Sequence, residues 1–446
     1  MTLIIIVIML MASLLIATEN WTNINKAAVA VFAGTVGWVL YICYGTDFVL
    51  SFHPSDFSTY LSDHFSENAS VKQFIAQNIF LKYVGRAAEV VLFLLATMTI
   101  VEVLNNNGCF DFISQLLRTH STHKILWTLT ATAFLLSINL DNLTTTVMML
   151  TIMHKVIQSR RQRMIFGSAI VLAANSGGAI TVIGDPAGLV LWNMGYVTPT
   201  IYSLSMMIPC LIACAIPVWW IGRMLPDRAD VEWITMPYRG NDTRLKTWQR
   251  LLMLFVGIGG LWLVPTFRSI TALSPFLGAL CVLSVLWIVN EFVNYRLINT
   301  EEMIQRRIPR VLQYGVIQMI LFVIGVMLAT GVVIETGIVS KLSSELNFQS
   351  QPAWLIGIGA GIVSSFLDNF ASAMSFFSIG NNLPPNSSYW GIVAFATAVG
   401  GNILASGSMS GLALLKMEHM RFGWYFRNVG WKAMLGGTLG LLWLCV

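Results

Sequence analysis

Length, composition and charge already exclude a soluble protein. The chain has 446 residues, of which 56% are hydrophobic and 11% charged, and its net charge is +5. Soluble domains carry about 25% charged residues. The basic residues are spread among loops and no GxxxxGK[ST] sequence occurs, so neither a nucleic-acid partner nor nucleotide hydrolysis is expected.

Apolar stretches long enough to cross a bilayer recur along the chain. A helical crossing takes about 20 residues, and helices follow because lipid-facing backbone must satisfy its own hydrogen bonds. The predicted spans are residues 2–18, 27–43, 85–104, 200–222, 249–265, 271–290, 311–334 and 429–446. No cationic residue precedes the first span, so we expect it to be retained and not cleaved as a signal peptide. The fold class is therefore all-α, a polytopic membrane protein in contact with membrane lipid.

Three sequence blocks occur twice in the same order. LFLLATM (92–98) matches LFVIGVM (321–327), SINLDN (137–142) matches SSFLDN (364–369), and GGAITVIGDPAG (177–188) matches GGNILASGSMSG (400–411). The partners are 229, 227 and 223 residues apart, which is near enough to one value to indicate a duplicated unit. We predict membrane repeat 1 at residues 1–226, a cytoplasmic linker at 227–250 and membrane repeat 2 at 251–446.

Each LDN block lies between apolar arms that are short for a span. The first pair of arms, residues 124–139 and 143–157, predicts a re-entrant helical hairpin, and the basic residues flanking it place its open end in the cytoplasm. The flanks of the second LDN block, 349–352 and 380–388, contain no Lys or Arg, so that hairpin is expected to open outward. Repeat 2 is then an inverted copy of repeat 1. Inverted-topology repeats with discontinuous helices are typical of secondary transporters, and the glycine-rich blocks predict the breaks.

Polar residues gather at the predicted hairpin tips and helix breaks. An ionisable group at this depth costs at least about 2.5 kcal/mol, which favours a functional role. The alternative for Asp141 and Asp368 is that each caps a hairpin arm. The predicted cation- and proton-binding residues are Asp141, Asn142, Thr144, Thr145, Asn175, Ser176, Asp185, Asp368, Asn369, Asn402 and Ser406, with Asp141, Asp185 and Asp368 as ligands of a transported Na⁺.

The donor set at these positions favours a cation. Carboxylate, amide and hydroxyl oxygens are hard ligands that suit Na⁺ or Li⁺, and no Lys or Arg lies in either LDN block or either break. Desolvation favours the neutral, protonated carboxylate, so a proton competes for the same oxygens. The sequence therefore predicts exchange of Na⁺ or Li⁺ for H⁺ by alternating access, with no catalysis and no cofactor. For His154, both a pH-sensing role and a solvated surface position stay open.

Several segments together resemble the NhaD-type sodium/proton antiporters of the ion transporter superfamily. They are INKAAVAVFAG (24–34), LFLLATMTIVEVLNNNGCFD (92–111), LDNLTTT (140–146), AANSGGAITVIGD (173–185) and MEHMRFGWYFRNVGWKAMLGG (417–437). The resemblance implies a homodimeric scaffold with mobile hairpin domains in a bacterial inner membrane, and a site built from the aspartates and asparagines named above. Two departures bear on ion preference: Pro186, Ala187 and Gly188 replace a hydroxyl-rich run, and Phe370-Ala371 replaces Val-Pro.

Two other functions were weighed against antiport. An anion or arsenite carrier of the same superfamily would share the hairpins and broken helices, because substrate is set by a few side chains; it would have little need for Asp141 and Asp368. An intramembrane aspartyl protease would use two aspartates as acid and base. Ile183-Gly184-Asp185 is not a GxGD sequence, and a protease has no need for the inverted duplication.

Overall fold

The protein is built of helices. The computed structural model describes residues 2–22, 24–63, 71–117, 119–231, 245–294, 314–345, 351–380 and 383–445. Within these ranges, strand-type pairing is limited to two isolated bridges, Ser121 with Arg228 and Ile157 with Val231. The predicted all-α fold is thus confirmed.

Seven helices of the described ranges are long and apolar enough to cross a membrane. They are Lys26–Tyr44, Val71–Asn106, Pro199–Gly222, Thr247–Thr271, Pro275–Asn294, Ile317–Glu335 and Ser388–Met417. Two shorter apolar helices, Thr2–Ala17 and Ala353–Phe366, join them. A polytopic membrane protein is therefore confirmed as well.

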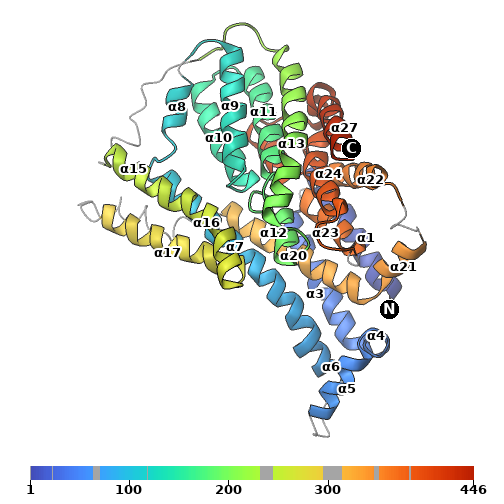
Figure 1. Ribbon diagram of the computed structural model, residues 1–446. Coiled ribbons are helices and arrows are strands. Elements are labelled where there is room, and N and C mark those ends of the chain that lie inside the picture. The colour runs from blue at the N-terminus through green and yellow to red at the C-terminus, as the bar shows by residue number, and fades with distance from the viewer. Residues whose placement is uncertain are drawn as a thin grey trace. The chain divides into compact units, whose positions relative to one another are not determined.

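The chain forms two compact units, whose helices are labelled in Figure 1. Unit 1 comprises Met1–Val91, Ile317–Gln351 and Met374–Leu383, and unit 2 comprises Leu92–Val316, Pro352–Ala373 and Pro384–Val446. Each unit takes segments from both predicted repeats. The repeats describe the duplication of the chain, whereas the units describe which segments pack together.

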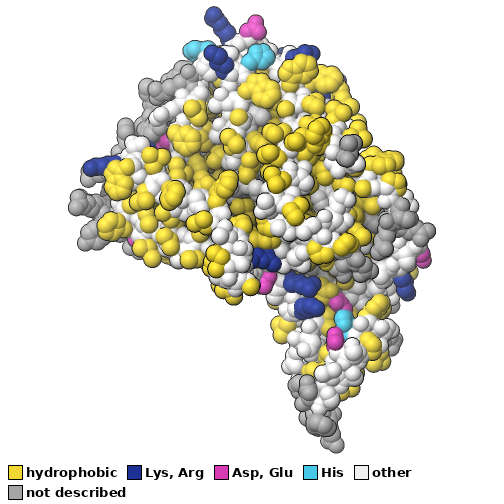
Figure 2. Space-filling model, in the orientation of Figure 1, with side chains coloured by type: hydrophobic (Ala, Val, Ile, Leu, Met, Phe, Trp, Pro, Cys, Tyr) yellow, Lys and Arg dark blue, Asp and Glu magenta, His cyan; other side chains and the backbone are white. Residues whose placement is uncertain are grey.

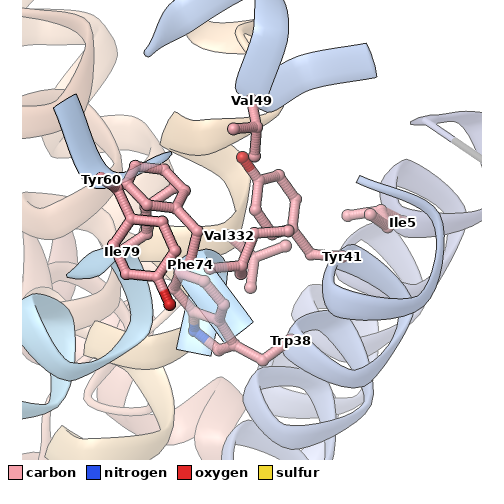
Figure 3. Close-up of a cluster of buried hydrophobic side chains, with 9 residues drawn as sticks. Ile5, Trp38, Tyr41, Val49, Tyr60, Phe74, Ile79 and Val332 are labelled. Atoms are coloured by element: carbon pink, nitrogen blue, oxygen red, sulfur yellow. The ribbon is translucent and has the colours of Figure 1, made fainter. Parts of the chain in front are cut away.

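Unit 1 contains the N-terminal helices and most of α20. Its helices are α1 (Thr2–Ala17), α2 (Glu19–Thr22), α3 (Lys26–Tyr44), α4 (Thr46–Phe52), α5 (Pro54–Asp63), α6 (Val71–Phe74), a π-helical segment (Ile75–Phe80), the start of α7 (Leu81–Asn106), α20 (Tyr314–Glu335) and α21 (Ile338–Glu345). A cluster of buried aromatic and aliphatic side chains forms its core (Figure 3). In it, the Trp38 indole donates a hydrogen bond to the Leu328 carbonyl at 3.0 Å and so joins α3 to α20.

A buried glutamate lies at one end of this core. Glu335 ends α20 and is 8% exposed. Its Oε1 accepts a hydrogen bond from the Tyr83 hydroxyl at 2.8 Å, and its Oε2 lies 2.8 Å from His53 Nε2. Both carboxylate oxygens are therefore satisfied inside unit 1, and Glu335 is a structural link between α20, α7 and the turn after α4.

The polar, acidic-leaning sequence of residues 45–84 predicts a loop outside the membrane. Most of this segment is helical in the structure: it contains α4, α5 and α6, the last of which continues through the π-helical segment into α7. The reason is that a few apolar side chains suffice for a helix that buries one face. Tyr60 and Phe74 are 8% and 2% exposed, with ring centroids 5.3 Å apart. Residues 64–70 lie outside the described residues.

Unit 2 contains α7 from Leu92 onward and the remaining helices, except that α23 belongs to unit 1 from Met374 onward. They are α8 (Phe112–Leu116), α9 (Thr122–Ser137), α10 (Asn142–Val156), α11 (Arg160–Gly178), α12 (Pro186–Asn193), α13 (Pro199–Gly222), α15 (Thr247–Leu254), α16 (Gly260–Thr271), α17 (Pro275–Asn294), α22 (Ala353–Phe366), α23 (Asn369–Ile379), α24 (Ser388–Leu404), α25 (Met409–Met417), α26 (Phe422–Tyr425) and α27 (Trp431–Cys445), with π-helical segments at Phe255–Gly259 and Phe426–Gly430. The predicted span at 271–290 begins later, at Pro275, because Ala272 adopts a left-handed conformation that ends α16. Most of the predicted linker, residues 232–244, lies outside the described residues.

Two hairpins and two broken helices carry the sequence blocks. We name α9–α10 hairpin 1, α22–α23 hairpin 2, α11–α12 broken helix 1 and α24–α25 broken helix 2. Helix α9 has 16 residues and α10 has 15, too few for a full crossing each. The breaks fall at residues 179–185 and 405–408, inside the two glycine-rich blocks. The predicted hairpins and discontinuous helices are present.

The two broken helices run in opposite directions through unit 2. Broken helix 1 begins at Arg160, whose guanidinium donates to the Glu418 carbonyl at 3.1 Å, just past the end of broken helix 2. Beyond the end of broken helix 1, the Tyr196 carbonyl accepts from the Asn386 amide at 2.8 Å, just before broken helix 2 begins. Each broken helix therefore starts where the other finishes, as an inverted repeat requires.

The duplication also appears in the packing of each hairpin on its broken helix. In repeat 1 the Ser137 hydroxyl donates to the Ala174 carbonyl at 2.6 Å, and in repeat 2 the equivalent Ser364 hydroxyl donates to the Thr397 carbonyl at 2.6 Å. A Cβ added to Gly184 would lie 2.6 Å from the Ser137 carbonyl oxygen. A Cβ on Gly407 would overlap the Ser364 carbonyl oxygen. The glycine before each second half-helix is thus needed for close approach.

Gly184→Ala and Gly407→Ala are expected to destabilise the protein. The added methyl meets backbone oxygens of the hairpin, which cannot move aside as a flexible side chain can. Gly359→Ala in α22 is the matched control, because a Cβ there meets nothing within 4 Å and alanine favours helix by about 1 kcal/mol. The check is the melting temperature of each purified variant in detergent; wild-type melting of both break variants would contradict the packing.

Candidate cation-binding site

Asp141 lies at the tip of hairpin 1 and caps α10. Its Oδ2 accepts hydrogen bonds from the Thr144 amide at 2.9 Å and the Thr144 hydroxyl at 3.1 Å, as expected of an aspartate at a helix start. The side chain is buried, and Oδ1 accepts no hydrogen bond from any described residue. The capping alternative therefore accounts for one carboxylate oxygen and leaves the other available to a ligand.

Asp185 occupies the break of broken helix 1 and caps α12. Pro186 starts that helix, where a missing amide proton does no harm, and Asp185 Oδ1 accepts from the Ala187 amide at 2.9 Å. Its Oδ2 lies 3.4 Å from the side-chain nitrogens of both Asn142 and Asn369. One carboxylate oxygen thus receives an amide from each hairpin tip.

The tip of hairpin 2 repeats the arrangement with different detail. Asp368 is 2% exposed, and its Oδ1 accepts from the Phe370 amide at 3.0 Å. The neighbouring Asn369 amide donates to the Gly407 carbonyl at 2.9 Å, which holds the tip against the break of broken helix 2. Both LDN blocks therefore reach one region of unit 2 from separate hairpins.

Asn175 joins the two broken helices. Its side-chain nitrogen donates to Asn402 Oδ1 at 2.8 Å and to the Ser408 hydroxyl oxygen at 2.9 Å. Ser408 also caps α25 by accepting from the Gly411 amide at 3.0 Å. Ser406, the predicted hydroxyl, is partly exposed two residues earlier in the same break. The side chains that form this junction are fully buried; they are those of Asn175, Asn402 and Ser408.

Ser408 is a site residue that the predicted set omits. Aligning GGAITVIGDPAG with GGNILASGSMSG pairs Asp185 with Ser408, and both cap the second half of their broken helix. The internal repeat therefore carried the signal for this residue. The site is asymmetric: repeat 1 supplies a carboxylate where repeat 2 supplies a hydroxyl.

Several buried polar atoms around the tips and breaks have no hydrogen-bond partner among the described residues. Buried polar groups of folded proteins are nearly always paired, so each such atom needs an explanation. In this region they are Asp141 Oδ1, Thr145 Oγ1, Thr146 Oγ1, Asn175 Oδ1, Ser176 Oγ, Ser372 Oγ, Asn402 Nδ2 and Ser410 Oγ. Seven of the eight are oxygens, which is the donor type that an alkali cation takes.

The three aspartates do not form a closed metal cage. No group of three His, Cys, Asp or Glu side chains in the described part of the chain converges closely enough to hold an ion. Asp141 and Asp368 nevertheless repel the charge on Asp185. A cation here would therefore draw on amide and hydroxyl oxygens as well as carboxylates, and it would relieve the repulsion among the three acids.

A further buried carboxylate of unit 2, that of Glu418, was not singled out from the sequence. It follows α25 and is 3% exposed; Arg163 Nε lies 3.0 Å from one of its oxygens, and His154 Nδ1 lies 3.0 Å from the other. The two basic residues come from α11 and the last turn of α10. Glu418 thus ties hairpin 1 to both broken helices, and His154 is half-exposed beside it.

Glu418→Gln is expected to lower the free energy of unfolding by about 3 kcal/mol, because it leaves Arg163 without its buried partner. The measurement is thermal unfolding of the purified protein in detergent. Glu345→Gln, on the exposed end of α21, is the matched control and should melt as the wild type does. Equal melting of Glu418→Gln and the control would mean that the ion pair adds nothing to stability.

A comparison with known protein families shows to which family the chain belongs. Residues 1–400 match the family described as citrate transporter, CitMHS. The chain belongs to the citrate transporter family. The match covers both hairpins and broken helix 1, together with most of α24.

Individual relatives of this family member carry antiporter names. Sodium/proton antiporter 1 of Arabidopsis thaliana is 30% identical over 361 residues, which is 80% of this chain and 61% of that relative, so the chain spans less than two thirds of its length. Sodium/proton antiporter 2 of the same plant is 29% identical over 370 residues, 80% of this chain and 85% of the relative. The Na⁺/H⁺ antiporter NhaD of Vibrio parahaemolyticus is 24% identical over 373 residues, 78% and 87% of the two chains. The predicted relationship to NhaD-type antiporters is confirmed.

A solved structure shares the fold. The YdaH transporter of Alcanivorax borkumensis superposes with a TM-score of 0.57 at 12% identity, over 84% of this chain and 89% of that one. At this identity the likeness speaks for the fold alone. Together, the family and its relatives confirm that the citrate transporter family member is a transporter and not an enzyme.

Proposed function

We propose that this citrate transporter family member exchanges Na⁺ or Li⁺ for H⁺ across the membrane by alternating access. The observation that carries the proposal is the position of Asp185. One of its oxygens lies between the amides of Asn142 and Asn369, one from each hairpin tip. A cation or proton bound at Asp185 would thus affect the contacts of both hairpin tips with this carboxylate. Sodium/proton exchange is also the activity in the names of several relatives.

The chemistry around Asp185 favours a small monovalent cation. Carboxylate, amide and hydroxyl oxygens are available, whereas thiol and imidazole groups, which suit softer metals, are missing from both LDN blocks and both breaks. The unpartnered Asp141 Oδ1 and Thr145 Oγ1 would complete the ligand set of Na⁺ or Li⁺. The ion is the cargo of the protein, so no resident metal or cofactor is needed.

Competition between cation and proton supplies the coupling. An unoccupied group of three buried carboxylates is costly because the charges repel one another and are desolvated. Either a bound cation or bound protons lower that charge. We propose that the loaded forms move between the two sides of the membrane and the empty, charged form does not, which makes the exchange obligatory.

Citrate is the substrate in the family's name, and citrate transport is the main rival function. A tricarboxylate needs cationic or strong hydrogen-bond donors, and residues 137–146, 173–188, 364–373 and 398–411 contain no Lys or Arg. The region holds Asp141, Asp185 and Asp368 instead, which would repel an anion. The same argument disfavours arsenite as its oxyanion and other anionic substrates.

Proteoliposomes with an imposed pH gradient and an internal pH dye test the proposal. Adding Na⁺ or Li⁺ outside should dissipate the gradient, while K⁺ serves as a control for charge and citrate as the rival substrate. A citrate response without a Na⁺ or Li⁺ response would overturn the cation proposal in favour of anion transport. No response to any of them, from protein shown to be folded by its melting curve, would also contradict it.

The cellular membrane and the oligomeric state of the protein are also proposals. The helices and relatives establish a multi-pass membrane protein. We propose that it resides in the inner membrane of a bacterium as a homodimer, with membrane lipid around it. Crosslinking of the protein in native membranes would test the dimer.

A further inference from the structure

A buried lysine of unit 2, Lys432, has no acidic partner among the residues that the structure describes. Lys432, in the first turn of α27, is 5% exposed. Its ammonium lies 3.1 Å from the Met224 sulfur and 5.6 Å from the centre of the Trp431 ring. A thioether is a weak acceptor without charge. The ion pairs described for unit 2 involve other residues. A buried ammonium without an anion is costly, so this position calls for a negatively charged ligand.

Lys432 lies at the end of a helix pair. Helices α13 and α27 pack closely along their length: a Cβ on Gly440 would lie 2.7 Å from the Pro209 carbonyl oxygen, and one on Gly436 would lie 2.7 Å from Pro217. The pairing therefore runs antiparallel and finishes where Met224 meets Lys432, two residues past the end of α13. The positive-inside argument places this end of α13 at the cytoplasmic surface. Lys432 is thus level with the headgroup region, not with the bilayer centre.

Exposed aromatic and basic side chains surround this end of the pair. The Arg223 guanidinium carbon lies 3.8 Å from the Trp219 ring centre, and the Trp220 and Trp431 rings meet edge to face at 4.8 Å. Trp219 is 53% exposed and Trp220 37%. Tryptophan at the ends of spans belongs to the interface between headgroups and acyl chains. Where α13 finishes, Figure 2 shows Lys and Arg side chains beside hydrophobic ones.

We propose that Lys432, Arg223 and the tryptophans of this helix end form a binding site for the phosphate of an anionic phospholipid in the cytoplasmic leaflet. The phosphate replaces the Met224 thioether as partner of the Lys432 ammonium and is also bound by Arg223. Trp219 and Trp220 contact the glycerol and upper acyl chain. Basic groups between membrane helices on the cytoplasmic side are suited to such headgroups. The site is independent of which ion the protein carries.

Native mass spectrometry of the purified protein tests the site, with phosphatidylglycerol as probe and phosphatidylcholine as the uncharged comparison. The wild type should retain phosphatidylglycerol preferentially. Lys432→Met, which keeps the apolar volume, and Arg223→Gln should each lower the retention about fivefold. Arg228→Gln, an exposed basic residue after α13, is the matched control and should leave retention unchanged.

Each other outcome has a definite meaning. Unchanged phosphatidylglycerol retention in both Lys432→Met and Arg223→Gln overturns the proposal. If millimolar inorganic phosphate removes the preference for phosphatidylglycerol in the wild type, the site takes free phosphate and the lipid assignment is wrong. Since Arg223 is exposed, Arg223→Gln folds even if Lys432→Met does not, and its retention alone then decides.

Discussion

Asp185→Asn is expected to abolish sodium-driven proton movement while the protein still folds. Asparagine caps a helix as well as aspartate does, so α12 keeps its start. The substitution removes the charge that faces Asn142 and Asn369. Even residues outside the ligand set of a metal change its affinity 10- to 100-fold, so a loss of at least about 100-fold in apparent Na⁺ affinity is expected. The measurement is the pH-dye assay in proteoliposomes.

Asp227→Asn is the control for this variant. Asp227 is an exposed aspartate of unit 2 beyond the end of α13, outside the hairpins and breaks. It should transport as the wild type does. Normal Na⁺ response in Asp185→Asn would move the binding site away from the break of broken helix 1 and leave the aspartate with a capping role alone.

Both hairpin tips are expected to need the charge of their aspartate for exchange. Asp141→Asn should abolish exchange, because it removes the charge of an oxygen that has no partner in the described protein, while the cap on Thr144 survives. Asp368→Asn should also abolish exchange, since it removes one of the three mutually repelling charges that a bound cation or proton would offset. The measurement is the initial rate of Na⁺- and Li⁺-driven pH change over a range of ion concentrations.

Asp141→Ala and Asp368→Ala complete this test. Alanine removes both the charge and the cap, so these variants should lose about 1 kcal/mol of stability as well as transport. The asparagine variants should melt near the wild type. Full transport by both asparagine variants would show that the two LDN blocks are hairpin caps and that the cation binds elsewhere.

Most of the fold was predictable because its signals are local. A span needs only a long apolar run, and within the described residues each predicted span lies mainly on a helix; residues 311–313 and 446 lie outside them. The breaks were predictable because glycine and polar residues interrupt apolar runs at residues 177–188 and 400–411. The opposite orientation of the two repeats was predictable from the basic residues that flank hairpin 1 and from their absence around hairpin 2. These signals survive in a single sequence because bilayer and backbone impose them on any chain.

The contacts at the site were less predictable because they depend on long-range packing. That Asn142 and Asn369 both face Asp185, and not each other, is decided by how two hairpins meet one break. Ser408 could have been predicted from the internal repeat, since it aligns with Asp185. Glu418 was not, because its partners His154 and Arg163 lie far away in the sequence and give no local pattern. The helical structure of residues 46–63 depends on aromatic packing of the same long-range kind.

Competition between Na⁺ and H⁺ at Asp185 is the central claim, and calorimetry of Na⁺ binding to the purified protein tests it most directly. Titrations in two buffers of different ionisation enthalpy count the protons released per ion bound. The claim predicts proton release, with Na⁺ affinity rising about tenfold per pH unit for each proton displaced, and no binding to Asp185→Asn. Binding that releases no proton and does not change with pH, or that persists in Asp185→Asn, would contradict it.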